Sequence, residues 1–273
     1  MFEAIKDLDY IRAFWMLSPN FGDALTPWLI QKITGQKVVW VNPDCDDIFF
    51  MVTGSILNHR APKAVVWGCG LAWFKDEIKD LYHVRAVRGP MSLAKAISYG
   101  YPIRGVFGDP ALLLPDLITD TIPMTSHRLG ITPHFVDYDF VYNKFKDIPE
   151  VSVINMMDSI EEVVKQICFC DHILSSSLHG LIVAHAYLKP ALWVQFSDKV
   201  LGDGFKFFDY LMSVQLPLYL PQNLRGISPA DIIELDIVRK LGEASHRPSQ
   251  DTLSKLRKGL WDSCPFLTSE LTI

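Results

Sequence analysis

Short apolar runs, rich in β-branched and aromatic residues, alternate with segments of helical period through the first half of the chain. These runs predict strands at Ala13–Leu17, Val38–Val41, Ile48–Gly54, Ala64–Trp67, Val84–Arg88 and Arg104–Phe107. Helices are predicted over Gly22–Gly35 and from Gly89 to Gly100, the second with a proline in its first turn. Because the strand runs are continuously apolar, the pattern indicates a parallel sheet covered by helices on both faces.

The second half of the chain repeats this alternation. Strands are predicted at Leu129–Phe135, Val151–Asn155, His172–Leu174 and Ala191–Phe196. Helices are predicted at Ser159–Cys168, where Glu162 completes a capping box, and at Leu178–Leu188, Pro229–Leu241 and Asp251–Trp261.

The segment Pro115–Arg128 has little periodicity and marks the predicted domain junction. We therefore expect an α/β protein with two Rossmann-like domains, residues 1–125 and 126–273, whose parallel sheets face a cleft. The tail helix, within residues 250–266, can pack back on the first domain.

Composition and charge narrow the function classes. Apolar residues make up 49% of the 273 residues and charged residues 21%, as in globular proteins. The net charge of −5 argues against a nucleic-acid partner. Five cysteines without repeated spacing argue against a disulfide framework or a structural zinc site and favour reduced thiols. No His, Asp or Glu cluster has metal-ligand spacing, so neither a metal nor a cofactor is expected.

The N-terminus carries acids where a signal peptide would have basic residues and an apolar core. The longest apolar run, Leu181–Val194, contains Lys189 and Pro190 and is too short and too polar to span a bilayer. We therefore expect a cytoplasmic protein that is at most peripheral to the inner membrane.

Polar and glycine-rich turns follow the predicted strands. They lie at Asn20–Asp23, Thr53–Ser55, Gly68–Gly70, Arg88–Pro90, Gly108–Pro110 and Ser175–Gly180. Ligands of parallel sheets gather at such carboxyl ends, where helix amides point outward. None of these turns is a phosphate-binding P-loop or a complete dinucleotide fingerprint, and no serine-hydrolase elbow or zinc-protease motif is present.

The turn Ser175–Gly180 is the richest in hydrogen-bonding groups. Ser176 or Ser177 can simply cap the following helix, but three serines exceed what one cap needs, so a bound anion is a natural further acceptor. His179 lies in the first helical turn beside that anion and can act as a general acid near neutral pH. His185, off the same helix face, is interpreted as a packed residue.

The first half offers a second group of candidates. Arg88 can be a solvated charge or a bidentate clamp on phosphate or carboxylate. Asp109, between glycine and proline, can be a turn residue. Either Asp109 or Asp23 can act as the base on an acceptor hydroxyl. Asn20 and Asp23 can cap a helix or bind sugar hydroxyls, and Trp73 is a candidate for stacking on a sugar ring.

Five motifs stand in the order found in a known family. They are Asn20-Phe-Gly-Asp23, Trp67-Gly-Cys-Gly70, Val87-Arg-Gly-Pro-Met-Ser92, Gly108-Asp-Pro-Ala-Leu-Leu-Leu-Pro115 and Ser175-Ser-Ser-Leu-His-Gly-Leu-Ile-Val-Ala184. With the ending Leu260-Trp-Asp-Ser-Cys-Pro-Phe266, the chain resembles the polysaccharide pyruvyl transferase family over nearly its whole length. It looks most like the short enzymes that decorate bacterial exopolysaccharide repeat units of the succinoglycan or xanthan type.

The resemblance implies a fold akin to GT-B glycosyltransferases and transfer of a pyruvyl group from phosphoenolpyruvate to two hydroxyls of a hexose as a cyclic ketal. His179 matches the catalytic histidine of the family, and Arg88 matches an arginine more loosely. The implied donor-binding residues are Ser175, Ser176, Ser177, Leu178, Gly180 and Arg88. The implied acceptor-binding residues are Asn20, Gly22, Asp23, Gly54 and Trp73.

One position departs from the family. Many members carry an arginine two residues before the histidine, where this chain has Ser177. Either the serines and helix amides replace its charge, or the donor is a different one, or a basic residue such as Arg128, Lys199 or Lys206 reaches the donor.

The implied acceptor is a lipid-linked oligosaccharide at the inner leaflet of the membrane. The basic residues Lys255, Arg257 and Lys258 of the tail helix can touch anionic headgroups, or they can form an ordinary solvated face. Two other functions stay open: a GT-B glycosyltransferase that uses a nucleotide sugar, as sialyltransferases do, and a carbohydrate-binding protein without catalysis.

Overall fold

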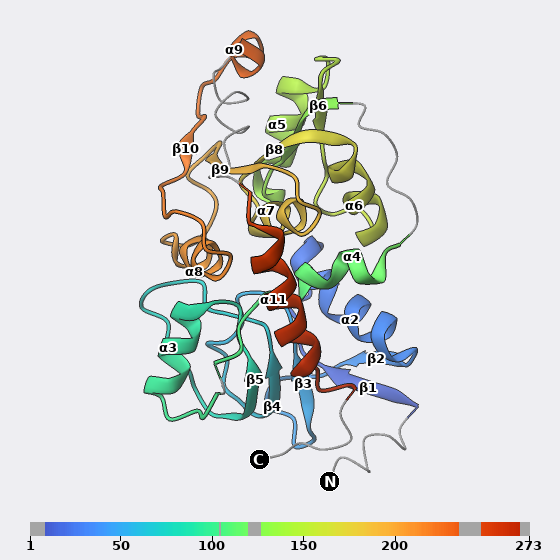
Figure 1. Cartoon of the computed structure of the whole chain (residues 1–273), viewed down its shortest axis with the longest axis vertical. Coiled ribbons are helices and arrows are strands. Elements are labelled where there is room, and N and C mark those ends of the chain that lie inside the picture. Colours follow the sequence, from blue (N-terminus) through green and yellow to red (C-terminus); the bar gives the residue numbers. More distant parts are fainter. Residues whose placement is uncertain (1–8, 104, 120–126, 235–246, 268–273) are drawn as a thin grey trace. The chain divides into compact units, whose positions relative to one another are not determined.

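The computed structural model describes residues 9–103, 105–119, 127–234 and 247–267. The chain forms two compact units (Figure 1). The N-terminal unit comprises the described parts of Met1–Pro110 and Ser254–Ile273, and the C-terminal unit comprises those of Ala111–Leu253. Each unit is built on a five-stranded, all-parallel sheet, which confirms the predicted α/β class with two Rossmann-like halves.

The sheet of the N-terminal unit has the strand order β2-β1-β3-β4-β5. Its strands are β1 (Tyr10–Ala13), β2 (Lys37–Trp40), β3 (Phe49–Met51), β4 (Ala61–Trp67) and β5 (Leu81–Ala86). Helix α2 (Phe21–Thr34) follows β1 and ends at Gly35, whose left-handed conformation suits glycine. Helix α3 (Pro90–Ser98) follows β5.

Two predicted strands of this unit are wrong. The first strand is β1, which ends at Ala13 and so shares one residue with the predicted strand Ala13–Leu17. The apolar run continues beyond the strand to Met16 and Leu17, which are 44% and 73% exposed. The predicted strand Arg104–Phe107 is reduced in the described residues to one bridge between Val87 and Phe107.

The sheet of the C-terminal unit has the order β10-β9-β8-β6-β7. Its strands are β6 (His127–Thr132), β7 (Val151–Val153), β8 (Cys170–Ser175), β9 (Ala191–Gln195) and β10 (Gln222–Asn223). Its helices are α4 (Leu114–Leu117), α5 (Tyr138–Phe145), α6 (Ile160–Cys168), α7 (Leu178–Ala186), α8 (Phe205–Ser213) and α9 (Pro229–Glu234). Single-turn 3₁₀ helices lie at Pro110–Leu113 (η1) and Phe135–Asp137 (η2).

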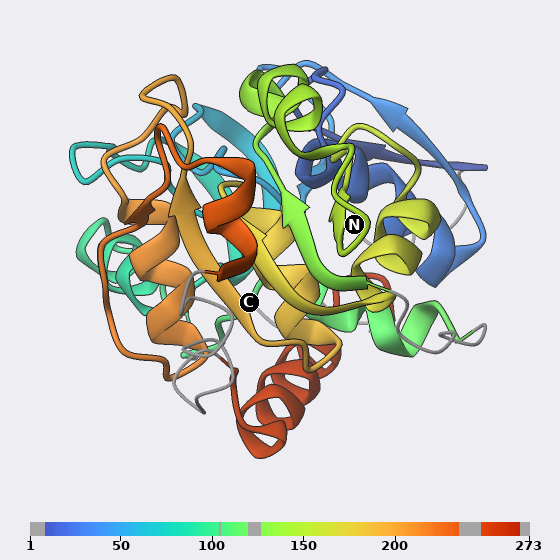
Figure 2. The same cartoon turned by 90° about the horizontal axis from the view of Figure 1, so that it is seen from above.

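Helices of the C-terminal unit lie on either side of its sheet in the view from above (Figure 2). The predicted cap of α6 is confirmed, because Ser159 Oγ accepts the Glu162 backbone N–H at 3.3 Å. All nine residues of α7 are buried. Of the predicted helix Pro229–Leu241, the part after α9 lies outside the described residues.

The tail helix α11 (Gln250–Asp262) contributes its later turns to the N-terminal unit. Trp67 Nε1 donates to the Leu260 carbonyl at 3.1 Å, and Arg85 Nε donates to the Ser263 carbonyl at 2.8 Å. The ring of Phe266 packs edge-on against Trp67, with centroids 5.8 Å apart. Within the described residues, no helix is both long and apolar enough to cross a bilayer.

Candidate active site

The turn between β8 and α7 is closed by its own first serine. The buried hydroxyl of Ser175 donates to the Ser177 carbonyl at 2.6 Å and accepts the Ser177 backbone N–H at 3.2 Å. The backbone N–H of Ser176 donates to the Thr132 carbonyl at 3.2 Å, which ties the turn to the end of β6. The Ser175 hydroxyl therefore shapes the turn.

The other two serines are placed differently. Ser176 Oγ accepts the His134 backbone N–H at 2.9 Å and so joins the turns that follow β6 and β8. Ser177 is the N-cap residue of α7, but its side chain makes no capping bond to the amides of that helix. The side-chain capping that the sequence suggested for Ser176 or Ser177 is therefore not seen at α7.

His179 is the second residue of α7, and its side chain is 6% exposed. His185 is fully buried, with Nδ1 3.0 Å from the Tyr210 hydroxyl, which confirms the interpretation of this histidine as a packed residue. At Gly180, an added Cβ would lie 2.3 Å from Thr132 Oγ1 and 2.6 Å from Ser175 Oγ. Glycine at this position therefore lets α7 approach the strand ends closely.

A cavity of about 380 Å³ lies next to this turn. Its wall includes Ser176, Gln195 at the end of β9 and Lys206 in the first turn of α8. The apolar side chains of Leu201 and Leu220 also line it. Because the volume lies in the range of small-molecule sites and the lining combines apolar surface with a few polar groups, the cavity can hold a ligand.

Helix α8, which forms part of the cavity wall, was not predicted from the sequence. The run Phe205–Ser213 follows Gly202-Asp-Gly204, whose glycines both have positive φ, and this context indicates a turn more than a helix start. The available signal was the apolar spacing of Phe205, Phe208 and Leu211, which fits one helix face.

The positive charge of Lys206 acts on the neighbouring turn. Burial, and next the charge of Lys206, lower the pKa of His134 from its ordinary value of 6.5 to about 4. Lys206 Nζ donates to the Leu201 carbonyl at 3.2 Å. The carboxyl edge of the C-terminal sheet therefore brings together His134, Ser176 and Lys206.

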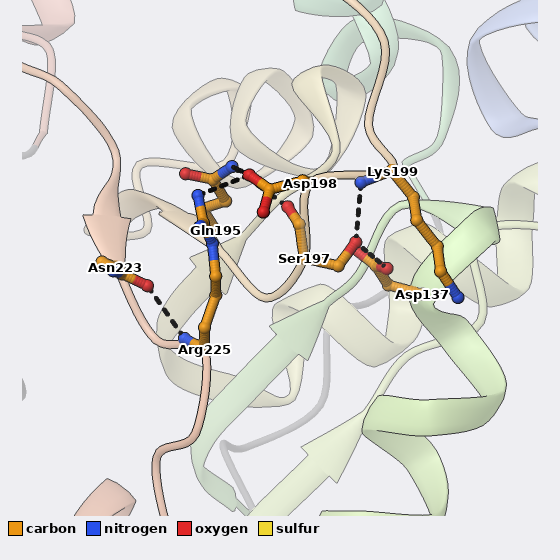
Figure 3. Close-up of polar contacts among 7 residues, drawn as sticks. All are labelled: Asp137, Gln195, Ser197, Asp198, Lys199, Asn223 and Arg225. Atoms are coloured by element: carbon orange, nitrogen blue, oxygen red, sulfur yellow. Dashed lines mark hydrogen bonds and ion pairs between the residues drawn. The ribbon is translucent and has the colours of Figure 1, made fainter.

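The loop after β9 is fixed by polar contacts (Figure 3). Asp137, buried at the end of η2, accepts the Ser197 hydroxyl at 2.5 Å, and the Lys199 backbone N–H donates to the same hydroxyl at 3.0 Å. Asp198 forms an ion pair with Arg225 at 2.6 Å. These contacts hold the chain that leads to the cavity wall.

The three basic residues considered as replacements for the family arginine are placed differently. Arg128 lies at the amino end of β6, about 13 Å of strand from Thr132. Lys199 is exposed in the loop after β9. Lys206 lines the cavity together with Ser176.

In the N-terminal unit, Arg88 is fully buried. Its Nη1 donates to Ser55 Oγ at 2.9 Å, and its Nη2 donates to the Leu71 carbonyl at 2.5 Å. At Gly70, an added Cβ would lie 2.6 Å from the Arg88 Cζ atom. Arg88 therefore joins the turns that follow β3 and β4 to the end of β5.

Asp109 is also fully buried. Burial raises the pKa of the Cys69 thiol to about 12, with the Arg88 charge opposing that rise and the Asp109 charge adding to it. Both charged groups therefore act on the same thiol. All five cysteines are free, as predicted.

Four of the predicted acceptor residues come together. Thr53 Oγ1 donates to the Gly22 carbonyl at 2.8 Å. Asn20 Nδ2 donates to Asp23 Oδ2 at 3.4 Å, and a Cβ at Gly54 would lie 3.5 Å from Asp23 Oδ1. The edge formed by Asn20, Gly22, Asp23 and Gly54 therefore presents carboxylate and amide groups suited to hydroxyls.

Trp73 lies in the loop after β4 and is half-buried. Its backbone N–H donates to Asp76 Oδ2 at 2.9 Å, and the Lys75 ammonium lies 5.3 Å from its ring centroid.

The predicted catalytic residues are divided between the units, with His179 in the C-terminal one and Arg88 and Asp109 in the N-terminal one. In the part of the chain that the structure describes, no three His, Cys, Asp or Glu side chains are grouped to hold a metal ion.

The chain is similar to one family model and to two known proteins. A family model described as polysaccharide pyruvyl transferase matches residues 6–197, a range that holds both the Arg88 turn and the His179 turn. The uncharacterized protein L143 of Acanthamoeba polyphaga mimivirus is 30% identical over 210 residues, which cover 72% of this chain and 72% of that protein. The succinoglycan biosynthesis protein ExoV of Rhizobium meliloti (strain 1021) is 25% identical over 206 residues, which cover 71% of this chain and 61% of that protein.

No solved structure matches the chain, so its likeness to GT-B enzymes stays a prediction. The family model covers most of the chain, including the turns at the strand ends of both units. The chain therefore belongs to the polysaccharide pyruvyl transferase family and is a transferase that moves pyruvyl groups in polysaccharide synthesis.

Proposed function

We propose that the protein transfers the carbon skeleton of phosphoenolpyruvate to two hydroxyls of a hexose, forming a cyclic pyruvate ketal and releasing inorganic phosphate. One observation carries the proposal. His179 stands in the first turn of α7, and Ser176 of the same turn belongs to a cavity wall that also carries Lys206. A proton donor and a cation are thus held by neighbouring elements of one unit.

The chemistry follows from the donor. Its enol carbon becomes electrophilic when the methylene carbon takes a proton, which the imidazolium of His179 supplies. One hydroxyl oxygen then bonds to that carbon and gives its proton to a base. The bond between that carbon and the phosphate oxygen breaks, and phosphate leaves with the bonding electron pair and takes up the proton from the base. The second hydroxyl closes the ring, and its proton restores His179.

The donor anion requires positive groups, and we assign them to Lys206 and the amides at the start of α7. Ser177, the N-cap residue of α7, makes no side-chain capping bond to those amides. Helix N-termini favour phosphate and carboxylate groups. Lys206 then supplies the charge that the family arginine would provide at Ser177.

For the acceptor we assign the edge of the N-terminal unit formed by Asn20, Gly22, Asp23 and Gly54. Asp23 is half-buried, whereas Asp109 is fully buried, so Asp23 is the better candidate for the base that takes a hydroxyl proton. The relative from Rhizobium meliloti is named for succinoglycan biosynthesis, which supports a polysaccharide repeat unit as the acceptor. We propose further that this repeat unit is carried on a lipid.

The decisive experiment incubates the purified chain with phosphoenolpyruvate and a panel of β-galactosides, glucosides and mannosides. We expect phosphate release that depends on one acceptor class, together with a pyruvyl adduct found by mass spectrometry. Thermal melting with phosphoenolpyruvate or with nucleotide sugars is measured in parallel. Stabilisation by a nucleotide sugar alone would instead support a glycosyltransferase, and sugar binding without phosphate release would support a carbohydrate-binding protein.

The assignment of Lys206 has its own test. We expect Lys206→Gln to raise the KM for phosphoenolpyruvate roughly tenfold or more, because a charge-assisted contact to the donor is lost. Lys165→Gln is the control, since Lys165 lies on the exposed side of α6 and pairs with Glu162. Equal KM values for the two variants would contradict the assignment.

A further inference from the structure

Near the cavity of the C-terminal unit, three leucine side chains are largely exposed to solvent. Leu201 is 75% exposed, Leu218 53% and Leu220 77%. Leu201 and Leu220 line the same cavity, and Leu218 precedes Leu220 by two residues. Single exposed leucines are ordinary on protein surfaces, but a group gathered at one rim marks an interaction site. We call these three residues the leucine ridge.

The ridge is held outward by the residue between its last two members. Tyr219 packs against the core of the unit, and its hydroxyl accepts the Trp193 backbone N–H at 3.0 Å. Because exposure alternates along this stretch, an inward Tyr219 turns both neighbouring leucines toward solvent. The segment leads into β10, which lies beside β9 at the edge of the sheet (Figure 1).

The charges around the ridge favour an anionic partner. Lys199 is exposed two residues before Leu201. Of the two nearby acids, Asp198 pairs with Arg225 at 2.6 Å (Figure 3), and Asp203, whose Oδ1 accepts the Phe205 backbone N–H at 3.2 Å, shares the cavity wall with the cation Lys206. The positive charge of Lys199 is therefore in excess. An apolar ridge flanked by a cation suits the boundary between lipid headgroups and acyl chains.

The size of the ridge separates a membrane from a protein partner. A stable protein interface buries about 800 Å² on each partner, with flat, well-packed surfaces. Three protruding side chains cover far less than that area, whereas a small amount of inserted apolar surface beside basic residues gives a reversible contact with a bilayer surface. We propose that the leucine ridge inserts into an anionic lipid bilayer and brings the mouth of the cavity to the membrane surface.

The proposal is tested by sedimentation of the full chain with vesicles of phosphatidylcholine, with and without phosphatidylglycerol. We expect the wild type to sediment with the mixed vesicles. The variant Leu201→Ser/Leu218→Ser/Leu220→Ser should partition at least roughly tenfold less, because its apolar contact is removed. Since all three leucines are exposed, this variant should melt at the wild-type temperature, and the double variant Leu218→Ser/Leu220→Ser is a fallback if it does not.

Two controls complete the experiment. Ile97→Ser/Phe140→Ser removes side chains that are 54% and 53% exposed elsewhere, and it should bind as the wild type does. The tail-helix variant Lys255→Gln/Arg257→Gln/Lys258→Gln should also bind normally. The proposal is overturned if the wild type stays in the supernatant, if the ridge variant binds like the wild type, or if the Ile97/Phe140 control loses as much binding. The assay contains no donor or acceptor, so its failure would leave the proposed pyruvyl transfer intact.

Discussion

The strand ends of the two units present similar residue types with opposite results. In the N-terminal unit, the guanidinium of Arg88 is enclosed by the turns after β3 and β4 and bonds to Ser55 and Leu71. In the C-terminal unit, the corresponding edge keeps a cavity of about 380 Å³ with Lys206 in its wall. A basic residue at a strand end can therefore hold a turn together or face a ligand, and only its burial and partners distinguish the two.

The largest effect is expected at the C-terminal edge. His179→Ala should lower turnover about 10²–10⁴-fold, because a general acid typically contributes that much. The variant should fold, since the removed ring leaves the turn contacts of Ser175 and Ser176 in place. Phosphate release per folded molecule, with circular dichroism as a folding check, measures the effect.

The matched control for that prediction is His185→Gln, six residues further along α7. It removes the ring stacked on Tyr210 and should lower the melting temperature while leaving turnover per folded molecule near the wild-type value. Near-normal turnover of His179→Ala would contradict the role of His179 as the acid.

The N-terminal arginine should behave in the opposite way. Arg88→Gln removes buried, charge-assisted bonds to Ser55 and Leu71 and should lower the free energy of unfolding by about 3 kcal/mol. Denaturant unfolding measures this loss. If Arg88 instead clamps the donor, as the sequence suggested, the KM for phosphoenolpyruvate will rise while stability stays near that of the wild type.

Glycines that admit close contacts extend the comparison to both units. Gly70→Ala would place Cβ 2.6 Å from Arg88 Cζ, and Gly180→Ala would place it 2.3 Å from Thr132 Oγ1. Each should reduce the free energy of unfolding by about 1–3 kcal/mol through overpacking. The control is Gly259→Ala, because the added Cβ would lie at an ordinary 3.6 Å from the Val106 side chain. Gly259 lies within α11, where alanine should raise the free energy of unfolding by about 0.5–1 kcal/mol.

Unfolding in urea ranks the three glycine variants. Destabilisation by Gly259→Ala equal to that of the others would mean that a general loss of glycine flexibility, and not close contact, sets the order. Unchanged stability of Gly180→Ala would mean that α7 can move away from the strand ends.

Local patterns predicted much of this fold. Continuous apolar runs were enough to predict both parallel sheets, and Ser159 with Glu162 marked the start of α6 because a capping box is formed within one turn. The run after Ala13 was misleading because its apolar residues continue a strand pattern after β1 has ended, although Met16 and Leu17 are exposed. Helix α8 was missed because its N-cap residue is Gly204 and Gly202 lies two residues earlier, a context that indicates a turn.

The candidate site depended on contacts that no local pattern contains. Ser176 was predicted to lie near a ligand, but its partner, the His134 backbone N–H, is 42 residues away in the chain. Arg88 could be recognised as a strand-end cation, whereas its enclosure by Ser55 and Leu71 requires three turns to meet. Residue types at strand ends were therefore predictable, and their individual tasks were not.

The smallest expected effect is a pH dependence of stability, and its largest single contribution comes from His134 in the C-terminal unit. The folded pKa of His134 is about 4, below its ordinary 6.5, so the unfolded chain binds the proton more tightly. Stability from this group is therefore complete above about pH 6.5 and is lost as the pH falls toward 4. Between pH 7.5 and 5 the free energy of unfolding should fall by about 1–2 kcal/mol. Solvent screening keeps the fall within this range, because His134 is only partly buried. Burial also lowers the pKa of His59 and His83 in the N-terminal unit, which adds a slope of the same sign.

The variant His134→Asn isolates the C-terminal contribution, because asparagine can still accept the Val136 N–H that His134 accepts at 3.4 Å. Urea unfolding at several pH values should show a shallower loss of stability for this variant than for the wild type. Lys206→Gln should flatten the slope less, since burial is the larger cause of the shift and the Lys206 charge the smaller one. If His134→Asn and the wild type lose equal stability between pH 7.5 and 5, the acid sensitivity comes from other groups. Burial and the Lys206 charge then do not act on His134 strongly enough to change the stability by this amount.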